Sequence, residues 1–562
     1  MIRDVAERGT ARRRGQGIGR AAVMIGVITV LARLVGFGRQ VAFAHTVGTT
    51  CLGTAYTTAN MVPNIIYDIV LGGALSAVVV PVLAGPARDA APGEGGPAVD
   101  AARRISSALL TWTVLLLAPV SAALALAAHP IVTVLLSHSS GCPRTVMADV
   151  GARMLMVFAP QVLLYGLAVV LYGILQSYRR FYGPALAPLL SSLVVIGAYA
   201  AFGAIGGEYV FGNRLHELTP LAEYVLSVGT TLGVAALVVT AVFPARRLDL
   251  RLRPALRFPP GVGSRVRRLA LAGLLTLVAQ DASAAVVIVL SNRYGSTGAL
   301  VIYGFAWAVF MVPFAVLAVP IATSAFPALS AGADPPAHAA AIVGADASRG
   351  FDETAAISTR AVMVASWLGT AVLVGARWPL ARVFESHDVY GASVLALALA
   401  AFAPGLVGYG ISANLSRVLY ARGRNRAPAL AIGGGWLLVI AADLVIVPFV
   451  APRHVVPALG LGMSFGLTLS GLSLLVLVRR DLGTAALHGV SRAFLAGLVG
   501  AVAAAVAGSL LAGELSAPGF FVNVGTSVLV TVVVTAVFAG VAGSIDGGDL
   551  RAAVARLRGR PS

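Results

Sequence analysis

Two arginines lie within the first apolar stretch of the chain, where charged side chains are rare. Arg33 and Arg39 are six residues apart, and Gly36 and Gly38 between them predict local unwinding of a helix. A charge at bilayer depth costs at least about 2.5 to 3.5 kcal/mol on insertion scales, so the pair predicts a use in a water-filled cavity. The alternative is that a guanidinium, that of Arg39 more readily, extends to the membrane interface.

A polar stripe follows in the second apolar stretch. Asn60, Asn64 and Asp68 recur every four residues and therefore share one face of a helix. Pro63 removes one backbone hydrogen bond, which predicts a kink or break beside this face. Asp68 is expected either to form an ion pair with an arginine of the first stretch or to contact a ligand directly.

Three polar residues fall inside later apolar stretches, namely Gln280, Asp281 and Asp443. Carboxylates isolated at membrane depth are candidates for carrying H⁺ or coordinating Na⁺, so these residues are the predicted ion-coupling site. The alternative for each aspartate is a structural role as a protonated, hydrogen-bonded acid.

The residue patterns give no support to enzyme chemistry. The chain has no Lys, so it lacks the phosphate-binding G-x-x-x-x-G-K-[ST] loop of ATP-driven transport. The eight His residues are scattered, without an H-E-x-x-H motif or a Cys cluster, which argues against a zinc site. We therefore expect no catalytic residues, no metal site and no cofactor, with H⁺ or Na⁺ as a coupling ion.

The elements that must position these residues are membrane helices. Of 562 residues, 58% are hydrophobic and 11% are charged, whereas soluble domains carry roughly 25% charged residues. Stretches near the length that spans a bilayer predict an all-α polytopic membrane protein with about fourteen transmembrane helices. The predicted spans are 20–44, 52–84, 103–128, 148–177, 184–205, 219–244, 266–291, 298–329, 355–376, 391–420, 428–449, 456–478, 491–513 and 518–543.

The arginines predict the orientation of these spans. With the N-terminus in the cytoplasm, inner loops and tails hold 32 arginines and outer loops hold 7. Positive charge favours the cytoplasmic side, so both termini of this multi-pass plasma-membrane protein are expected there. The arginines occupy short loops without interleaved aromatics, which argues against a nucleic-acid partner.

The loops predict how the chain is divided. The most basic inner segment, Arg246 to Arg268, separates six spans from eight and predicts a boundary between two lobes. The polar segment 331–352 predicts a solvated linker. Cys51 and Cys142 both fall on the predicted outer side, where they form a disulfide or remain unpaired.

Several short motifs occur in a fixed order. They are Ala32-Arg33-Leu34-Val35-Gly36-Phe37-Gly38-Arg39, Pro63-Asn64, Gly73-Ala74, Val80-Pro81-Val82-Leu83, Arg180 to Pro188, Val312-Pro313, Phe326-Pro327-Ala328-Leu329-Ser330, and Tyr420 followed by Pro428. Together they resemble the MviN/MurJ family, lipid II flippases of the multidrug/oligosaccharidyl-lipid/polysaccharide exporter superfamily. Arg33 and Arg39 fall on the two first-helix arginines of that family.

The chain departs from the family at charged cavity positions. Thr54 stands where many members have an acidic residue, Tyr67 replaces a basic residue, Gly72 replaces an acidic one, and Ala308 replaces an arginine. Asp68 matches an acidic position of the actinobacterial branch, which the chain resembles more. The resemblance therefore implies a cavity with fewer charges than in many members.

The resemblance implies two pseudosymmetric six-helix lobes and two last helices that line a groove for a lipid tail. The organisation would be an Arg-rich cytoplasmic tail (1–19), an N-terminal lobe (20–245), a basic connector (246–265), a C-terminal lobe (266–480), the last two helices (481–545) and a second Arg-rich tail (546–562). The headgroup diphosphate would bind Arg33 and Arg39 through forked hydrogen bonds. Asn60, Asn64 and Asp68 would complete the substrate site.

The implied function is that of a transporter, not an enzyme. It would flip a polyprenyl-diphosphate-linked peptidoglycan precursor, lipid II, from the inner to the outer leaflet by alternating access, driven by membrane potential or an ion gradient. The expected partners are lipid II or a similar polyprenyl-linked glycan, membrane lipids, and proteins of cell-wall synthesis or division. The alternatives are an exporter of another lipid-linked glycan or a small molecule, and a non-transporting scaffold for wall synthesis.

Overall fold

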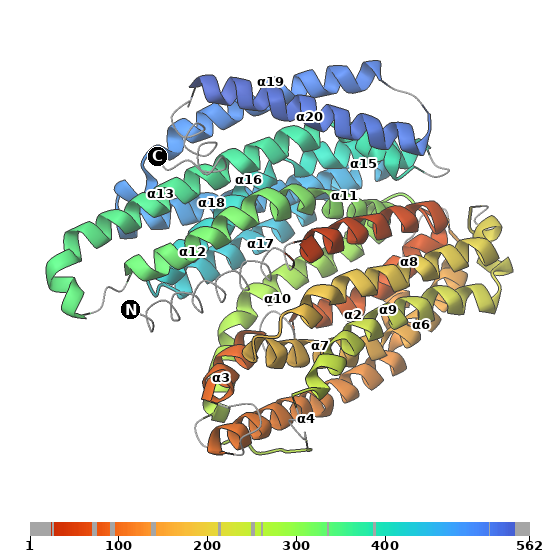
Figure 1. Ribbon diagram of the computed structural model, residues 1–562. Helices are drawn as coiled ribbons and strands as arrows, with labels where there is room; N and C mark the ends of the chain where they lie inside the picture. The colour runs from red at the N-terminus through yellow and green to blue at the C-terminus, as the bar shows by residue number, and fades with distance from the viewer. Residues whose placement is uncertain are drawn as a thin grey trace, which may run out of the picture. The chain divides into compact units, whose positions relative to one another are not determined.

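The described part of the chain is helical. The computed structural model describes residues 24, 27–69, 76–89, 96–136, 142–211, 215–248, 253–259, 262–333, 337–385, 389–515 and 518–545. These residues form long helices joined by short turns and contain no strand (Figure 1). The all-α prediction is confirmed.

Most predicted spans coincide with helices that are long and apolar enough to cross a membrane. Within the described residues there are 11 such helices, and a bent pair, Gly391–Phe402 with Gly405–Ala421, brings the number to 12. The other two predicted spans, 52–84 and 266–291, are helical where they are described. They contain α2 (Cys51–Ile69), α3 (Ser76–Asp89) and α10 (Val262–Tyr294).

Several spans change direction or helix type beside a proline. One span divides into α6 (Arg144–Phe158) and α7 (Pro160–Ser177), and another into α11 (Ala299–Pro313), a π-helical turn and α12 (Val319–Ala333). The bent pair, α15 (Val389–Phe402) and α16 (Gly405–Ala421), is separated at Pro404 and bent by 45°. Because proline has no N–H group, each of these positions lacks one helical hydrogen bond.

The remaining helices complete the bundle. The first helix covers Val27–Thr46. The others are α4 (Pro97–Leu126), α5 (Ala128–Leu135), α8 (Tyr182–Phe211), α9 (Pro220–Arg246), α13 (Ala337–Gly375), α14 (Arg377–Val383), α17 (Arg426–Ile446), α18 (Val455–Leu482), α19 (Val490–Glu514) and α20 (Phe520–Ile545).

Much of the segment 331–352 is helical, whereas its polarity predicted a linker. Helix α13 begins at Ala337 and continues without interruption into a membrane span. The segment is rich in alanine, which has the highest helix propensity, so the helix begins before the candidate membrane span, which starts at Gly350.

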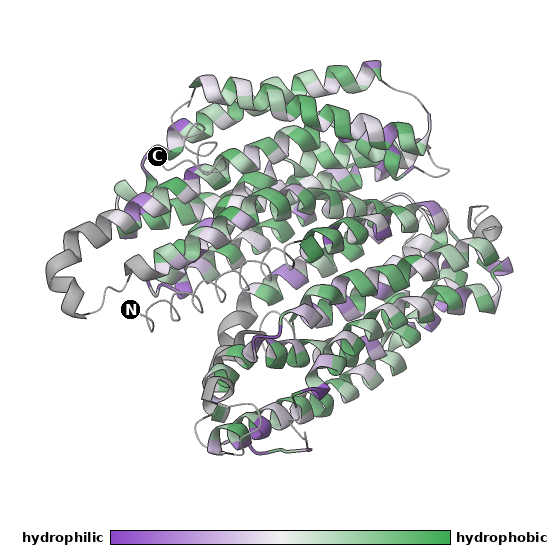
Figure 2. Ribbon diagram, viewed as in Figure 1, coloured by the Kyte–Doolittle hydropathy of each residue, from purple (hydrophilic) through white to green (hydrophobic). Residues whose placement is uncertain are grey.

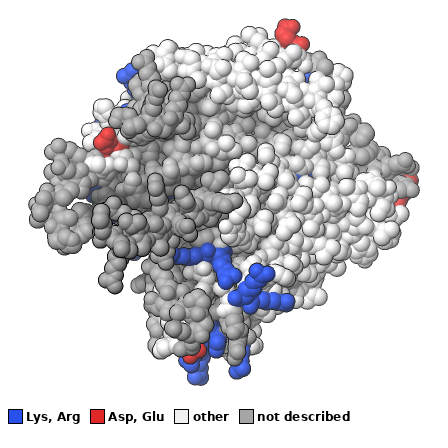
Figure 3. Space-filling view, viewed as in Figure 1, with Lys and Arg blue, Asp and Glu red and all other residues white. Residues whose placement is uncertain are grey.

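Charge is concentrated at helix ends. Figure 2 shows hydrophobic residues along the helices, with hydrophilic residues mainly near their ends and in the turns. Arg104 at the start of α4 and Arg179 and Arg180 after α7 are exposed. On the face drawn in Figure 3, most of the described surface is uncharged and the blue side chains gather in a few places. This distribution is typical of a protein whose middle section contacts lipid.

The chain divides into two compact units. Unit 1 contains residues 1–47, 55–134 and 145–277, and unit 2 contains 48–54, 135–144 and 278–562. Two short segments of the first half of the sequence, 48–54 and 135–144, thus belong to unit 2.

Small residues allow the helices of each unit to approach closely. In unit 1, a side chain at Gly173 of α7 would collide with Val79 of α3. In unit 2, a side chain at Gly466 of α18 would collide with Val439 and the Gly435 carbonyl of α17. Close contact of small residues is a common way to pack membrane helices, because no hydrophobic effect drives helices together within lipid.

The last two helices also pack closely on α13 through glycine residues. Gly508 of α19 lies so close to Gly375 of α13 that an added Cβ would be 3.1 Å from the Gly375 Cα. Helices α19 and α20 lie side by side in Figure 1 and share an apolar cluster with α13, which includes Ala504, Val534 and Phe538. Their other faces carry exposed Leu and Val side chains.

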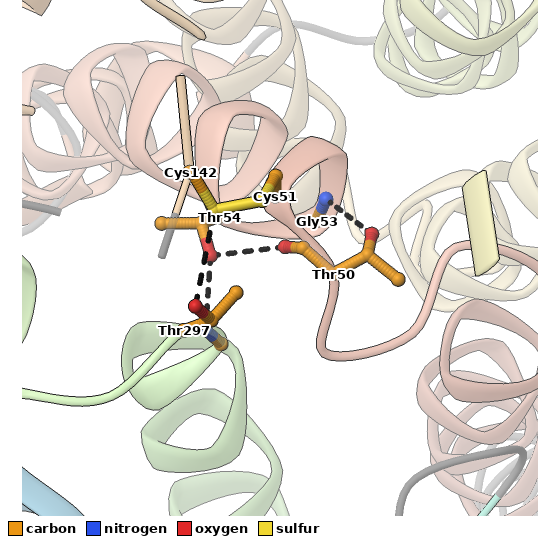
Figure 4. The surroundings of a disulfide bond; sticks show 7 residues. Thr50, Cys51, Gly53, Thr54, Cys142 and Thr297 are labelled. Carbon is orange, nitrogen blue, oxygen red and sulfur yellow. Dashed lines mark hydrogen bonds between the residues drawn. A yellow bond between two sulfur atoms is a disulfide. The ribbon is translucent and has the colours of Figure 1, made fainter. Parts of the chain in front are cut away.

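A disulfide joins Cys51 and Cys142 within unit 2 (Figure 4). The two Cα atoms are 5.9 Å apart, and the bond connects the first turn of α2 to the segment before α6. The choice between a disulfide and two unpaired cysteines is thereby resolved.

Candidate functional site

The face of the first helix that carries Arg39 lies among three tyrosines of unit 1. Phe43, one turn after Arg39, packs against the rings of Tyr56 and Tyr199, with centroids 5.1 and 5.3 Å away. Arg39 is half-buried, and its guanidinium is within electrostatic range of the hydroxyls of Tyr56, Tyr165 and Tyr199. The fold therefore gathers side chains of the first helix, α2, α7 and α8, which we call the tyrosine cluster.

Three hydroxyl groups of this region form a hydrogen-bonded chain. Tyr56 Oη lies 2.9 Å from Tyr199 Oη and 2.8 Å from Thr230 Oγ1 of α9. Thr230 donates its single hydroxyl hydrogen to the Leu226 carbonyl, 2.7 Å away. Thr230 must then accept from Tyr56, and Tyr56 must accept from Tyr199. The Tyr199 oxygen is left as an acceptor for another donor, such as a guanidinium.

The polar stripe of α2 contributes to the same region. Asn64 Oδ1 accepts a hydrogen bond from Tyr165 Oη at 3.0 Å, and the Tyr165 and Tyr67 rings are 4.1 Å apart. Asn60 Oδ1 is buried and has no hydrogen-bond partner among the described residues. Asp68 is half-buried and interacts electrostatically with Tyr67 and Tyr165. The stripe thus presents oxygen acceptors in the unit that holds Arg39.

Arg33 and Arg39 have different surroundings. Six residues of helix separate them by about 9 Å along the axis and about 120° around it. Arg33 is exposed between the exposed side chains of Val30 and Leu34, and it makes no ion pair with any described carboxylate. Asp68 likewise forms no ion pair with either arginine in the described part of the chain. Arg39 is therefore the arginine that the fold places in the tyrosine cluster.

Both helices are continuous at the positions of the predicted breaks. Residues 27–46 form one helix through Gly36 and Gly38, and α2 continues through Pro63. Glycine permits unwinding without requiring it, and one missing N–H at Pro63 does not end a helix whose neighbours satisfy the freed carbonyl. The polar side chains are thus presented by continuous helices.

The three predicted ion-coupling residues lie in unit 2. Gln280 is half-buried in α10, and the next residue, Asp281, is 3% exposed. Asp443 of α17 is 1% exposed, and neither of its carboxyl oxygens has a hydrogen-bond partner among the described residues. Gly462 of α18 packs against it, since a Cβ there would overlap Asp443 Oδ1. Tyr303 of α11 is within electrostatic range of Asp443.

Several residues of the cluster were not predicted as site residues. Tyr56 lies four residues before Asn60 and extends the stripe of α2 by one turn, so the same spacing could have identified it. Tyr165, Tyr199 and Thr230 have no comparable signal, because they fall in other predicted spans and no spacing in the sequence connects them to Asn60 or Asn64. Of the positions that depart from the family pattern, Gly72 lies outside the described residues.

Two solved structures of membrane proteins have the same fold as this chain. A solved structure described as "Inward-facing conformation of a multidrug resistance MATE family transporter of the MOP superfamily" matches with a TM-score of 0.62 at 13% identity, covering 82% of this chain and 98% of that chain. A solved structure of "Lipid II flippase MurJ, inward closed conformation" matches with a TM-score of 0.67 at 17% identity, covering 92% of this chain and 99% of that chain. This chain shares the fold of both solved structures.

Sequence comparison specifies the family. The chain matches the family described as "Lipid II flippase MurJ" over residues 43–533. The lipid II flippase MurJ of Burkholderia cenocepacia is 25% identical over 452 residues, which cover 79% of this chain and 81% of that protein. The chain belongs to the lipid II flippase MurJ family, and it is a multi-pass membrane transporter.

Proposed function

We propose that this protein flips lipid II from the inner to the outer leaflet by alternating access. The observation that carries the proposal is the half-buried Arg39, which lies among tyrosine hydroxyls and forms no ion pair with a described carboxylate. A partly desolvated guanidinium is most stable opposite an anion. The diphosphate of a polyprenyl-linked precursor has the charge and the paired oxygens that a guanidinium binds best.

The neighbouring groups suit the rest of such a headgroup. Asn60 Oδ1, Asn64 and Asp68 offer acceptors for the hydroxyl and amide hydrogens of a glycopeptide. We propose that Arg33, which lies on the exposed part of the first helix, also binds the headgroup. Polar headgroups cannot cross about 30 Å of hydrocarbon unaided, so a hydrated cationic site is needed while the tail stays in lipid.

The proposed organisation has two lobes, residues 20–245 and 266–480, joined by the basic connector 246–265. Rocking of one lobe against the other would expose the headgroup site to each side in turn. Residues 481–545 are proposed to line the groove for the lipid tail, since α19 and α20 expose Leu510, Val528 and Val532. An apolar surface of this kind suits a polyprenyl chain.

The proposed energy source is the membrane potential or an ion gradient, with Gln280, Asp281 and Asp443 as the coupling residues. A carboxyl group as buried as that of Asp443 must be neutral or accompanied by a cation to avoid a large desolvation cost. Such a group can therefore bind and release H⁺ or Na⁺ as its surroundings change. Moving one elementary charge across 100 mV supplies about 2.3 kcal/mol.

Depletion of this protein in its native cell tests the proposed substrate. We expect lipid II to accumulate with its headgroup on the cytoplasmic side, measured by mass spectrometry of lipid extracts and by protection from an impermeant headgroup-modifying enzyme. Accumulation of another lipid-linked glycan would assign a different precursor. Unchanged precursor pools together with defective assembly of wall enzymes would indicate a scaffold instead.

Both termini are proposed to be cytoplasmic. The count of 32 inner against 7 outer arginines supports this orientation. The disulfide supports it independently, because Cys51 and Cys142 then lie on the oxidising side of the membrane.

Single cysteines at two exposed positions test the orientation. Arg453→Cys should react with a membrane-impermeant maleimide in intact cells, and Arg424→Cys should react only after permeabilisation. The native cysteines should not react with the maleimide, since both are in the disulfide. The opposite labelling pattern would reverse the orientation.

A further inference from the structure

Arg377 lies at the junction of α13, α14 and α19 in unit 2. It is the first residue of α14, and the membrane span of α13 ends two residues before it, at Gly375. Its Nη1 group donates to the Val374 carbonyl at 2.8 Å and to Ser509 Oγ of α19 at 3.1 Å. The guanidinium carbon lies 6.0 Å from the centre of the adjacent Trp378 ring. These contacts hold the half-buried guanidinium in one position.

The other edge of this guanidinium has no partner among the described residues. A guanidinium has five N–H groups, and the two on Nη1 are those that bond Val374 and Ser509. Nε and Nη2 of Arg377 make no hydrogen bond with a described residue, and no described carboxylate lies within ion-pair distance. Two parallel N–H groups on a partly desolvated charge can therefore bind an anion.

Two other arginines of this chain show what the same edge binds. Arg153 donates from Nε and Nη2 to the two carboxylate oxygens of Glu223, at 2.9 and 2.8 Å. Arg492, at the opposite end of α19 from Ser509, donates from the same two nitrogens to the Ile545 carbonyl. In both cases an oxygen acceptor of the protein lies against this edge. Arg377 differs because no described residue supplies the acceptor.

Arg377 lies at the end of unit 2 that carries the disulfide. Phe384, directly after α14, lines the same small pocket as Thr49, which is two residues before Cys51. In the proposed orientation this end faces the outside, where only 7 of the 41 arginines fall. The neighbouring Trp378 is of a residue type that is enriched at the level of the lipid headgroups. A lipid headgroup of the outer leaflet can therefore reach Arg377.

Exposed apolar side chains lead along α19 to this arginine. Val502, Val506 and Leu510 recur every four residues, so they lie on one face of the helix, and they are exposed. Leu510 directly follows Ser509, whose hydroxyl bonds Arg377. This stripe belongs to the surface that we assign to the lipid tail. A lipid whose tail follows the stripe outward reaches Arg377 with its phosphate end.

We propose that Arg377 binds the diphosphate of a polyprenyl lipid in the outer leaflet, while the tail of that lipid lies along the exposed stripe of α19. Two diphosphate oxygens match the Nε–Nη2 edge in the way that the Glu223 carboxylate matches it at Arg153. The apolar stripe suits the isoprenoid chain. The inference rests on the proposed function, to which it adds a second binding site for the same lipid on the outer side.

Photo-crosslinking at position 510 tests the site. In Leu510→Cys, a benzophenone maleimide labels this position alone, since both native cysteines are in the disulfide. The purified protein is placed in phosphatidylcholine vesicles that contain either a polyprenyl diphosphate or the polyprenyl alcohol of the same length. Mass spectrometry after illumination measures how much protein carries each lipid. We expect Arg377→Gln to reduce capture of the diphosphate severalfold and to leave capture of the alcohol unchanged, which also shows that the variant is folded.

Two further variants separate diphosphate binding from other roles of this charge. In Arg377→Lys the ammonium can still donate to the Val374 carbonyl but cannot bind two oxygens in parallel, so capture of the diphosphate should fall nearly as far. Arg382→Gln removes a charge from the same short helix, about 140° around its axis, and should not change capture. Normal capture by Arg377→Gln or Arg377→Lys, or equal losses in Arg377→Gln and Arg382→Gln, would overturn the proposal.

Competition distinguishes the polyprenyl diphosphate from an ordinary phospholipid. An equal amount of phosphatidylglycerol in the vesicles should displace little of the diphosphate, because its single phosphodiester carries less charge. Equal competition would assign the site to phospholipids and overturn the proposal. The measurement involves no transport. If the protein does not flip lipid II and capture still depends on Arg377, the proposed function fails while the outer site stands.

Discussion

Arg39→Lys should lose most transport of lipid II although it keeps the positive charge. An ammonium group cannot make the two parallel hydrogen bonds with which a guanidinium holds two oxygens of a diphosphate. Arg39→Ala should be worse, with a loss of about 2 to 5 kcal/mol in substrate binding, because the headgroup is left unpaired in a partly desolvated site. Complementation of a flippase-depleted strain by each variant, with lipid II quantified in the same cells, measures the loss.

The control separates the site from general effects of removing an arginine. Arg104→Lys makes the same exchange at an exposed position at the start of α4 and should complement fully. An immunoblot of membranes excludes loss through misfolding. If Arg39→Lys supports normal growth at normal abundance, Arg39 only extends to the interface, and recognition of the headgroup must rest on Asn60, Asn64 and Asp68.

Asp443→Asn is the second substitution for which we expect a large effect. The amide has nearly the same size as the acid but cannot bind or release a proton, and it is a poor ligand for a cation. If Asp443 couples transport to an ion, the variant should flip lipid II at least about tenfold more slowly, an effect of about 1.4 kcal/mol. The residual transport should no longer respond to collapse of the H⁺ or Na⁺ gradient by an ionophore.

If Asp443 is a neutral acid with only a structural role, we expect the opposite result. An asparagine at this position would then preserve both the rate and its response to ionophores, because it replaces a neutral polar group with another of the same shape. Asp149→Asn is the matched control, since the Asp149 side chain is 57% exposed and should tolerate the change. Thermal unfolding of the purified variants shows whether either substitution alters stability.

The class of the protein follows from the sequence because hydropathy acts locally. Each apolar stretch of about 20 residues must become a helix in lipid, where every backbone group needs an internal partner. Elements that depend on a balance of local preferences were less predictable. Helix α13 includes an alanine-rich segment for which the sequence predicted a linker. The first helix is continuous through Gly36 and Gly38, for which the sequence predicted unwinding.

The site was partly predictable for the same reason. The four-residue spacing of Asn60, Asn64 and Asp68 reveals a shared face, because helical periodicity is a property of the local chain. The partners of that face come from other helices. Tyr165 lies 101 residues from Asn64, and Tyr199 lies 143 residues from Tyr56, so no local pattern connects them.

From the sequence alone came the membrane class, the helical spans, the family resemblance and the choice of Arg39 as a candidate site residue. Tertiary packing distinguished Arg39 from Arg33, which have the same side chain in the same helix but different neighbours. Packing also paired Cys51 with Cys142 and placed Gly298 against Thr49. The rotation of a helix about its axis and the approach of distant loops depend on contacts between residues that are far apart in the chain. Hydropathy and residue spacing are local properties, so they determine neither the rotation nor the approach.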